Sequence, residues 1–389
     1  MADAPSPRQQ GSPPELSDCL LERIRAGGSH SDAERTPDAG VIAELARCGL
    51  MRLLVPSELG GRGCHPGEFV EFARRIAHEH PSTGWVAMTC NEEAEIFASH
   101  FDAATVSAFY GADPNAVIAG SGVPKGVARP TDCGWIVDGR WPFVSGCAAA
   151  DWWILTCLVD GPRPRQLCYV LIRADADLID DTWHTVGLRG TGSHDVVLSE
   201  RFVPAEWAAV VDSFALPKPS GHPWYRLPSG LRFPFPKTGV AAGIAERALA
   251  EFTELAGSKT PLFEHSSLAH RAEAQTGIAR ATALVGAGRA FVDAMLEEVW
   301  QAASAGGEAV PAGLHARARL ACSWSVQNCI AAAEILANAA GSTANYTSSP
   351  LGGLLNDVRA VAGHFMVGSH QMDTAGRVLL GLDPGDPRF

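Results

Sequence analysis

The spacing of apolar residues changes twice along this 389-residue chain, and this change constrains its fold more than any other feature. Residues 15–114 and 237–389 show helical spacing, whereas residues 115–212 contain short apolar runs between Gly, Pro and Asp turns. Helices first, strands next and helices again predict an α+β protein with separate domains.

The first part carries recognisable helix starts. Thr36-Pro37-Asp38 offers a capping hydroxyl and a proline in the first turn, Pro66 opens a second helix, and another starts near Ser82-Thr83. We therefore predict an N-terminal α-helical domain over residues 15–114. Residues 1–14 lack the apolar stretch of a signal peptide and are predicted to be a disordered tail.

The middle part has little helical pattern, which predicts a small β-barrel or β-sandwich over residues 115–212. The expected strands are Ala116–Gly122, Trp135–Val144, Trp152–Val159, Cys168–Ile172 and Val196–Val203. Residues 213–236 are rich in proline and are predicted to form a linker or crossing loop.

The alanine-rich remainder, residues 237–389, predicts a C-terminal four-helix bundle. Its helices are expected at residues 238–256, 266–302, 311–340 and 351–380. We see no internal repeat.

Composition narrows the function classes. The net charge of −12 argues against nucleic acid or an anionic membrane as the main partner, and no segment approaches the ~20 uninterrupted apolar residues of a membrane span. The ten cysteines include no C-x-x-C pair, which favours buried thiols in a reducing cytoplasm. His78 and His80 would point to different faces of a helix, so no metal site is predicted.

Two segments combine glycine, aromatic and hydroxyl side chains most densely. They read GRWPFVSGCAAADWW at residues 139–153 and GLRGTGSHD at residues 187–195. Flat aromatic side chains beside a fixed hydroxyl suit a planar, hydrogen-bonding ring system. From spacing alone, packing of these aromatics in the core of a β-domain stays open, because aromatic residues favour strands.

The order of the three regions resembles the acyl-CoA dehydrogenase fold, and three further segments agree. Residues 49–61 read GLMRLLVPSELGG, residues 82–85 read STGW, and residues 375–384 read AGRVLLGLDP. With the two glycine-rich segments, they are similar to one subgroup of that fold, the two-component flavin-dependent monooxygenases. This resemblance implies reduced flavin (FMNH2 or FADH2) and O2 as cofactors, reacting through a flavin C4a-(hydro)peroxide.

The resemblance also implies roles for individual residues. Ser145 would hydrogen-bond the flavin N5, and Phe143, two residues earlier on the same strand face, would stack on the ring. Ser121 would meet the pyrimidine edge. His364 would face C4a, as a donor to the oxygen adduct or as a base for a substrate hydroxyl.

Further cofactor contacts are expected from Trp141, Arg189 and Lys259. Ser193 lies near Arg189 and would line the cofactor or the barrel surface. Lys259 is placed for a phosphate contact, with a solvated loop lysine as the equal alternative. Trp85, Asn91 and Glu92 would border the substrate cavity; the alternatives are packing for Trp85 and solvent exposure for Asn91 and Glu92.

A dehydrogenase of this fold needs a carboxylate base near the end of the chain or at the start of the first bundle helix. No glutamate follows Glu334, and His364 stands at about the first position. The second position, residues 232–235, also lacks a carboxylate. Proton abstraction from a thioester is therefore disfavoured.

We therefore expect a flavin-dependent monooxygenase that oxygenates a small aromatic or polycyclic substrate. Gly187, Gly190 and Gly192 do not form the G-x-G-x-x-G fingerprint, so a separate reductase would supply the reduced flavin by diffusion. The resemblance implies a homotetramer. Two alternatives remain at this point: an acyl-CoA dehydrogenase-type enzyme and a scaffold that binds no flavin.

Overall fold

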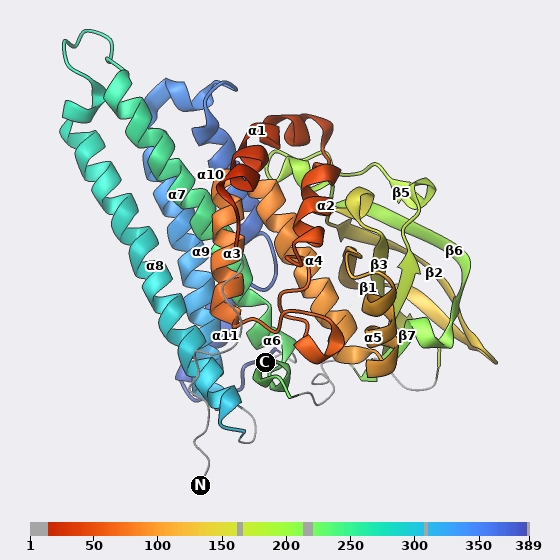
Figure 1. The fold of residues 1–389 in the computed structure, drawn as a ribbon. Coiled ribbons are helices and arrows are strands. Elements are labelled where there is room, and N and C mark those ends of the chain that lie inside the picture. Colours follow the sequence, from red (N-terminus) through yellow and green to blue (C-terminus); the bar gives the residue numbers. More distant parts are fainter. Residues whose placement is uncertain (1–14, 162–165, 213–220, 307–309, 387–389) are drawn as a thin grey trace.

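The computed structural model describes residues 15–161, 166–212, 221–306 and 310–386. The expected disordered tail over residues 1–14 lies outside the described residues. Within them, a group of helices and a β-sheet lie side by side, and a set of long helices packs against the other side of the helical group (Figure 1).

The N-terminal helices match the expected helical region. They are α1 (Asp18–Glu34), α2 (Ala39–Arg47), α3 (Pro66–Glu79), α4 (Pro81–His100) and α5 (Ala103–Ala112). The start of α2 differs from the sequence prediction, because Asp38 is the N-cap rather than Thr36. The Asp38 carboxylate accepts hydrogen bonds from the backbone N–H groups of Gly40 and Val41.

Helix α4 is the centre of the molecule. It contacts α3, α7 and strand β1, and nearly all of its residues are buried. The ion pair between Glu95 of α4 and Arg232 is fully buried. Because α4 lies between the sheet and the long helices (Figure 1), its side chains can reach both.

The β-domain is one seven-stranded mixed sheet. Its strands are β1 (Ile118–Thr131), β2 (Gly134–Val144), β3 (Trp152–Val159), β4 (Gln166–Arg173), β5 (Ile179–Asp180), β6 (His194–Pro204) and β7 (Ala208–Asp212). The strand order is β5-β6-β2-β1-β3-β4-β7, with β1 and β3 parallel and the other pairs antiparallel. This is an acyl-CoA dehydrogenase-like arrangement of helices and a mixed sheet; closure into a barrel or sandwich stays a prediction.

The end of β2 is irregular where the candidate site begins. The pairing of β2 with β6 shifts register between Trp141 and Val144, and Phe143 has a φ of 63°. Such a left-handed backbone is uncommon outside glycine and turns the chain out of the regular pleat. Simple alternation predicted that Phe143 and Ser145 share one strand face. Because of this irregularity, they do not.

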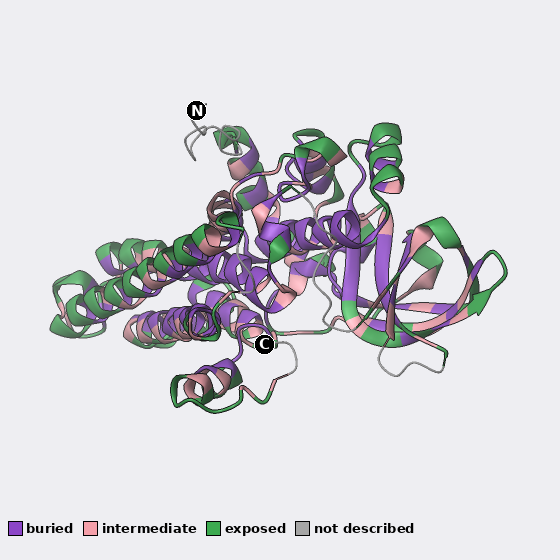
Figure 2. Cartoon of the chain, turned by 90° about the horizontal axis from the view of Figure 1, so that it is seen from below, coloured by how far each residue is buried: buried purple, intermediate pink, exposed green. Residues whose placement is uncertain are grey.

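The C-terminal region is helical, as expected. Its helices are α6 (Ser229–Arg232), α7 (Pro234–Ser258), α8 (Ala272–Ser304), α9 (Ala312–Ala340), α10 (Pro350–Ala362) and α11 (His370–Leu379). The helix predicted over residues 351–380 is therefore two helices, separated by residues 363–369. The long helices bury their inner faces and expose their outer faces (Figure 2).

Helix α9 is the element against which the other C-terminal helices pack. It contacts α7, α8, α10 and α11. Residues Ala312–Asn345 are apolar and long enough to cross a membrane by length and composition, but 61% of the apolar 18-residue window within them is buried inside the fold. Its apolar character is explained by these helix contacts.

The described part of the expected linker is packed rather than open. Trp224, Tyr225 and Leu231 are buried. This segment forms a 3-10 turn over Pro223–Arg226 and then α6, directly before α7. Residues 213–220 lie outside the described residues.

Candidate functional site

Four polar side chains from three parts of the fold form a continuous chain of hydrogen bonds. Trp85 Nε1 of α4 is 3.1 Å from Ser145 Oγ, which follows β2. Ser145 Oγ is 2.8 Å from Ser193 Oγ, and Ser193 Oγ is 2.7 Å from Thr191 Oγ1. All four residues are buried, so the two glycine-rich segments singled out in the sequence meet here.

The direction of these hydrogen bonds follows from their far end. The Thr191 hydroxyl lies 2.8 Å from the Leu188 carbonyl oxygen, which can only accept, so its one proton points there. Ser193 must then donate to Thr191, and Ser145 must donate to Ser193. Trp85 Nε1–H donates to Ser145. The Ser145 oxygen has therefore used its proton and one lone pair, and keeps one lone pair for a further donor.

His364 lies beside these hydrogen-bonded side chains, in the segment between α10 and α11. Its ring centroid is 5.7 Å from that of Trp85, in an edge-to-face arrangement. Its Nδ1 accepts a hydrogen bond from the backbone N–H of Met366 at 3.2 Å. Burial and the positive charge of Lys237 hold the pKa of His364 well below its usual range. The neutral ring therefore carries its proton on Nε2 and is a hydrogen-bond donor there.

A buried ion pair lies behind Trp85. Lys237 Nζ of α7 is 2.7 Å from both carboxylate oxygens of Glu92. The ammonium also lies 6.0 Å from the centroid of the Trp85 ring, within cation–π range. Glu92 thus lies at the site but not as an exposed side chain, and its charge is balanced within the protein.

Ser121 and Phe143 lie on the strand side of the site. The Ser121 hydroxyl donates to the carbonyl oxygen of Pro142 at 2.8 Å, which ties β1 to the end of β2. The Phe143 side chain is 60% exposed and meets Trp183 edge-to-face at 6.2 Å. An aromatic ring this exposed can pack against a flat ligand. The left-handed backbone of Phe143 sets the direction of this side chain, which regular strand alternation would not have given.

Trp141 and Asn91 do not join the site. Trp141 is fully buried, donates through Nε1 to the carbonyl oxygen of Thr156 at 2.6 Å, and packs over Gly126, where a Cβ would lie 2.0 Å from its ring. Asn91 is also fully buried. Its amide bonds the backbone of Leu50, Leu53 and Ala87. Both side chains fill the core, because their backbone positions turn them away from the site.

Arg189 and Lys259 are held by the protein itself. Arg189 donates to the backbone carbonyl oxygens of Asp32 and Thr185 at 3.2 and 2.9 Å. Lys259 Nζ lies 2.7 Å from the Ala340 carbonyl oxygen and 2.7 Å from Thr343 Oγ1. Lys259 is therefore neither a solvated loop lysine nor an uncommitted phosphate ligand; it holds the carbonyl end of α9.

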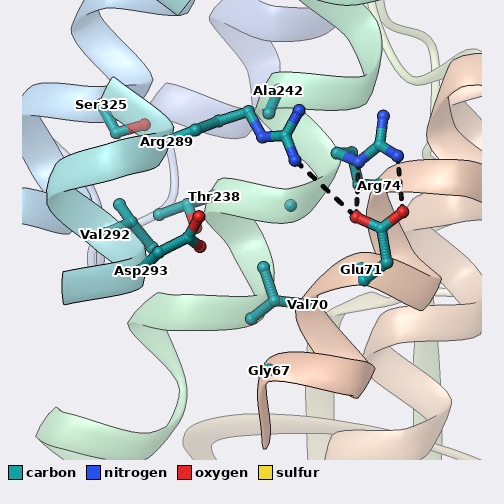
Figure 3. Close-up of a pocket in the computed structure, with 11 residues that line it drawn as sticks. Gly67, Val70, Glu71, Arg74, Thr238, Ala242, Arg289, Val292, Asp293 and Ser325 are labelled. Carbon is teal, nitrogen blue, oxygen red and sulfur yellow. Dashed lines mark hydrogen bonds and ion pairs between the residues drawn. The ribbon is translucent and has the colours of Figure 1, made fainter. Parts of the chain in front are cut away.

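A separate small cavity of about 110 Å³ lies between α3, α7 and α8 (Figure 3). It uses Thr238, Gly239 and Ala242 of α7, which lie on the opposite side of that helix from Lys237. Arg74 and Arg289 on its wall are paired with carboxylates. A cavity this small and charged does not suit a tricyclic ring, so it is not the candidate active site.

Sequence reasoning missed two parts of the site. Thr191 was not singled out, and Ser193 was only given a general place near the cofactor. The available signal was the glycine between them, because Gly192 permits the left-handed turn that brings the two hydroxyl oxygens within 2.7 Å of each other. No sequence motif indicated that Lys237 belongs to the site, because its pairing with Glu92 depends on how α7 packs against α4.

Comparisons with known proteins agree with this geometry. Residues 238–369 match the family model described as acyl-CoA dehydrogenase, C-terminal domain. The chain is 31% identical over 370 residues to the indole-3-acetate monooxygenase of Acinetobacter baumannii, covering 94% of this chain and 93% of that protein. It is also 31% identical over 392 residues to HsaA of Mycobacterium tuberculosis, a flavin-dependent monooxygenase oxygenase subunit, with 95% of each chain covered.

A solved structure supports the same assignment. XiaF from a Streptomyces species, in complex with FADH2 and glycerol, superposes with a TM-score of 0.83 at 25% identity, covering 95% of this chain and 96% of that chain. The chain therefore belongs to the flavin-dependent monooxygenases with an acyl-CoA dehydrogenase-like fold. These are oxidoreductases that use reduced flavin and O2.

The residues of the site fit a reduced flavin. Its N5 carries a hydrogen, and Ser145 Oγ keeps one lone pair that can accept it. The exposed Phe143 ring offers an apolar face for a planar group. On the strand side of the site, the Ser145 acceptor therefore matches the N5–H donor of reduced flavin.

Proposed function

We propose that this enzyme hydroxylates a small aromatic or polycyclic substrate at the site formed by Trp85, Ser145 and His364. The observation that carries the proposal is the pairing of opposite hydrogen-bond roles. Ser145 is left as an acceptor, while the neutral His364 is a donor, and both contact the Trp85 side chain.

Each residue has a defined task. Bound reduced flavin would supply the activation of O2. Ser145 would accept the N5–H hydrogen, Phe143 would cover the ring, and Ser121 would meet its pyrimidine edge. His364 would donate its Nε2 hydrogen to the reacting oxygen, and Trp85 would keep water away from it.

The carboxylates near the site do not provide the base of a dehydrogenase. Glu92 is held by Lys237 through both oxygens. Burial and the charge of Glu92 raise the pKa of Glu93 to about 8, so Glu93 is mostly protonated near neutral pH. Glu92 is therefore engaged by Lys237, and Glu93 carries its proton in most molecules at pH 7.

The proposal extends to the partners of the enzyme. A separate reductase would supply the reduced flavin, as the description of HsaA as an oxygenase subunit suggests for that relative. We also propose a homotetramer in which α7, α8, α9 and the pair of α10 and α11 form a C-terminal four-helix bundle beside the N-terminal helical domain and the β-domain. We further propose a cytoplasmic location. FMNH2 and FADH2 remain the two candidate flavins, with XiaF favouring FADH2.

Anaerobic titration with reduced flavin, followed by O2 and an aromatic substrate, tests this function. We expect wild-type protein to bind reduced flavin and form a hydroxylated product. Ser145→Ala should release more hydrogen peroxide per product, and His364→Ala should lower product yield while the melting temperature is retained. Absence of reduced-flavin binding would support a scaffold instead, and unchanged coupling in both variants would move the site elsewhere.

A further inference from the structure

One face of the otherwise buried helix α4 retains contact with solvent. Thr89 and Glu93 on this face are half-buried. Trp85, Glu92 and Ile96 are buried but keep 7%, 7% and 9% of their surface exposed. The five residues form one helical stripe. Side chains on the other faces, such as those on the Cys90 and Phe97 side, are almost completely excluded from solvent. Because Trp85 touches Ser145 and His364, this solvent-facing stripe of α4 continues the candidate site.

Glu93 lies where this stripe meets the sheet. A Cβ built on Gly120 of β1 would lie 2.7 Å from Glu93 Oε2, so the carboxyl group occupies the space over this glycine. Ser121, the next residue of β1, is one of the candidate flavin contacts. Consecutive strand residues point to opposite faces, so the Glu93 carboxyl group lies on the face of β1 that α4 covers, level with Ser121 along the strand but not beside its side chain.

The surroundings of Glu93 differ from those of its neighbours on α4. Glu92 pairs with Lys237, and Glu95 pairs with Arg232. Within the described residues, the Glu93 carboxyl group has no hydrogen-bond partner. Protonated near neutral pH, it offers one O–H donor and one carbonyl acceptor. This half-buried carboxyl group reaches solvent, so a ligand can take the place of water as its hydrogen-bond partner.

The charges around the stripe also restrict the ligand. Lys237 and Arg232 are the cations that approach it from α7 and α6, and both are engaged by carboxylates of α4. His364 is neutral. A substrate carboxylate would thus meet Glu92 and Glu93 without an uncommitted cation among these groups, and would lose its hydration without compensation.

We propose that Glu93 is a specificity-determining residue that hydrogen-bonds a hydroxyl or ring N–H of an uncharged aromatic substrate, and that this site discriminates against substrates carrying a carboxylate. This inference rests on the proposed function, because it places the substrate on the stripe next to Trp85. It separates this chain from its relative named for indole-3-acetate, an anionic compound.

Equilibrium binding with matched probes tests the inference. Indole and indole-3-acetate share one ring and differ in the carboxylate, and resorcinol is a second uncharged probe with hydroxyl groups. Binding would be followed at pH 7 by isothermal titration calorimetry, anaerobically with reduced flavin, for wild type, Glu93→Ala and Glu93→Gln. Glu206→Gln, at an exposed position, is the control, and melting temperatures confirm folding.

We expect wild type to bind indole or resorcinol at least 10-fold more tightly than indole-3-acetate. Glu93→Ala should weaken binding of the uncharged probes about 10-fold, whereas Glu93→Gln should retain most of it. Equal affinity for indole and indole-3-acetate, no saturable binding of either uncharged probe, or unchanged binding in Glu93→Ala would each overturn the inference. Reduced-flavin binding, measured on the same samples without a probe, reports separately on the proposed function.

Discussion

At the scale of single residues, the orientation of one proton organises the site. Thr191 gives its hydrogen to the Leu188 carbonyl oxygen, and this leaves Ser145 an acceptor two hydroxyls away. The N5 atom of oxidised flavin has no hydrogen, whereas that of reduced flavin has one. With Ser145 at N5, as proposed above, this arrangement would favour reduced over oxidised flavin.

Thr191→Val should weaken this preference. Valine keeps the shape of threonine but lacks the hydroxyl, so Ser193 and Ser145 can reverse their hydrogen bonds and Ser145 can donate to oxidised flavin. We expect the ratio of reduced- to oxidised-flavin affinity to fall about 5- to 10-fold, the size of one hydrogen bond of about 1–1.5 kcal/mol. Flavin titrations in both redox states measure this ratio.

Thr253→Val is the matched control, because Thr253 also donates to a backbone carbonyl oxygen, that of Leu249, on an exposed part of α7. The control should leave the ratio unchanged. If Thr191→Val also left it unchanged, the direction of the hydroxyl chain would not set flavin preference.

At the scale of elements, the sequence predicted most helices and strands but not their interruptions. The order of helical, strand and helical regions is confirmed, because periodicity reports burial along each element. The break at residues 363–369 and the irregular end of β2 at Phe143 were missed, since both depend on packing against other elements. For the same reason Trp141 and Asn91 were assigned to the site although they lie in the core.

Lys259 links two elements, because it caps the end of α7 and hydrogen-bonds residues at the end of α9. Lys259→Met removes two hydrogen bonds from a charged donor, to Ala340 and Thr343. We expect a loss of about 2 kcal/mol in the free energy of unfolding, measured by urea denaturation, with reduced-flavin affinity unchanged. Lys125→Met, on an exposed part of β1, should change neither quantity. Weaker flavin binding at unchanged stability would instead restore the phosphate role predicted from the sequence.

At the scale of the whole molecule, the site is assembled where three regions meet. Trp85 comes from the N-terminal helices, Ser145 from the β-domain, and Lys237 and His364 from the C-terminal helices. Each region could be located from the sequence, but the contacts among them could not, because they depend on side-chain packing between distant segments. This explains why the fold was predicted more completely than the site.

Global stability should depend on pH through Glu93. Its pKa is about 8 in the folded protein against 4.5 for the ordinary group, so the folded state binds the proton more tightly. This contribution to stability is complete below pH 4.5 and is lost as the pH rises to 8. Thermal unfolding should therefore show Glu93→Gln gaining several degrees over wild type at pH 8 and much less at pH 5. The melting temperature of Glu206→Gln should equal that of wild type at both pH values. An equal melting temperature for Glu93→Gln and wild type at pH 8 would show that the pKa of Glu93 is not raised.

The length of the segment over residues 363–369 can change the substrates that the enzyme accepts, because this segment positions His364. It carries His364 between α10 and α11, and each of these helices is anchored on α9 independently. An inserted or deleted residue there would shift the imidazole by a few ångströms while both anchors stay in place. Laboratory evolution toward larger or smaller substrates should therefore vary the length of this segment before altering the helices.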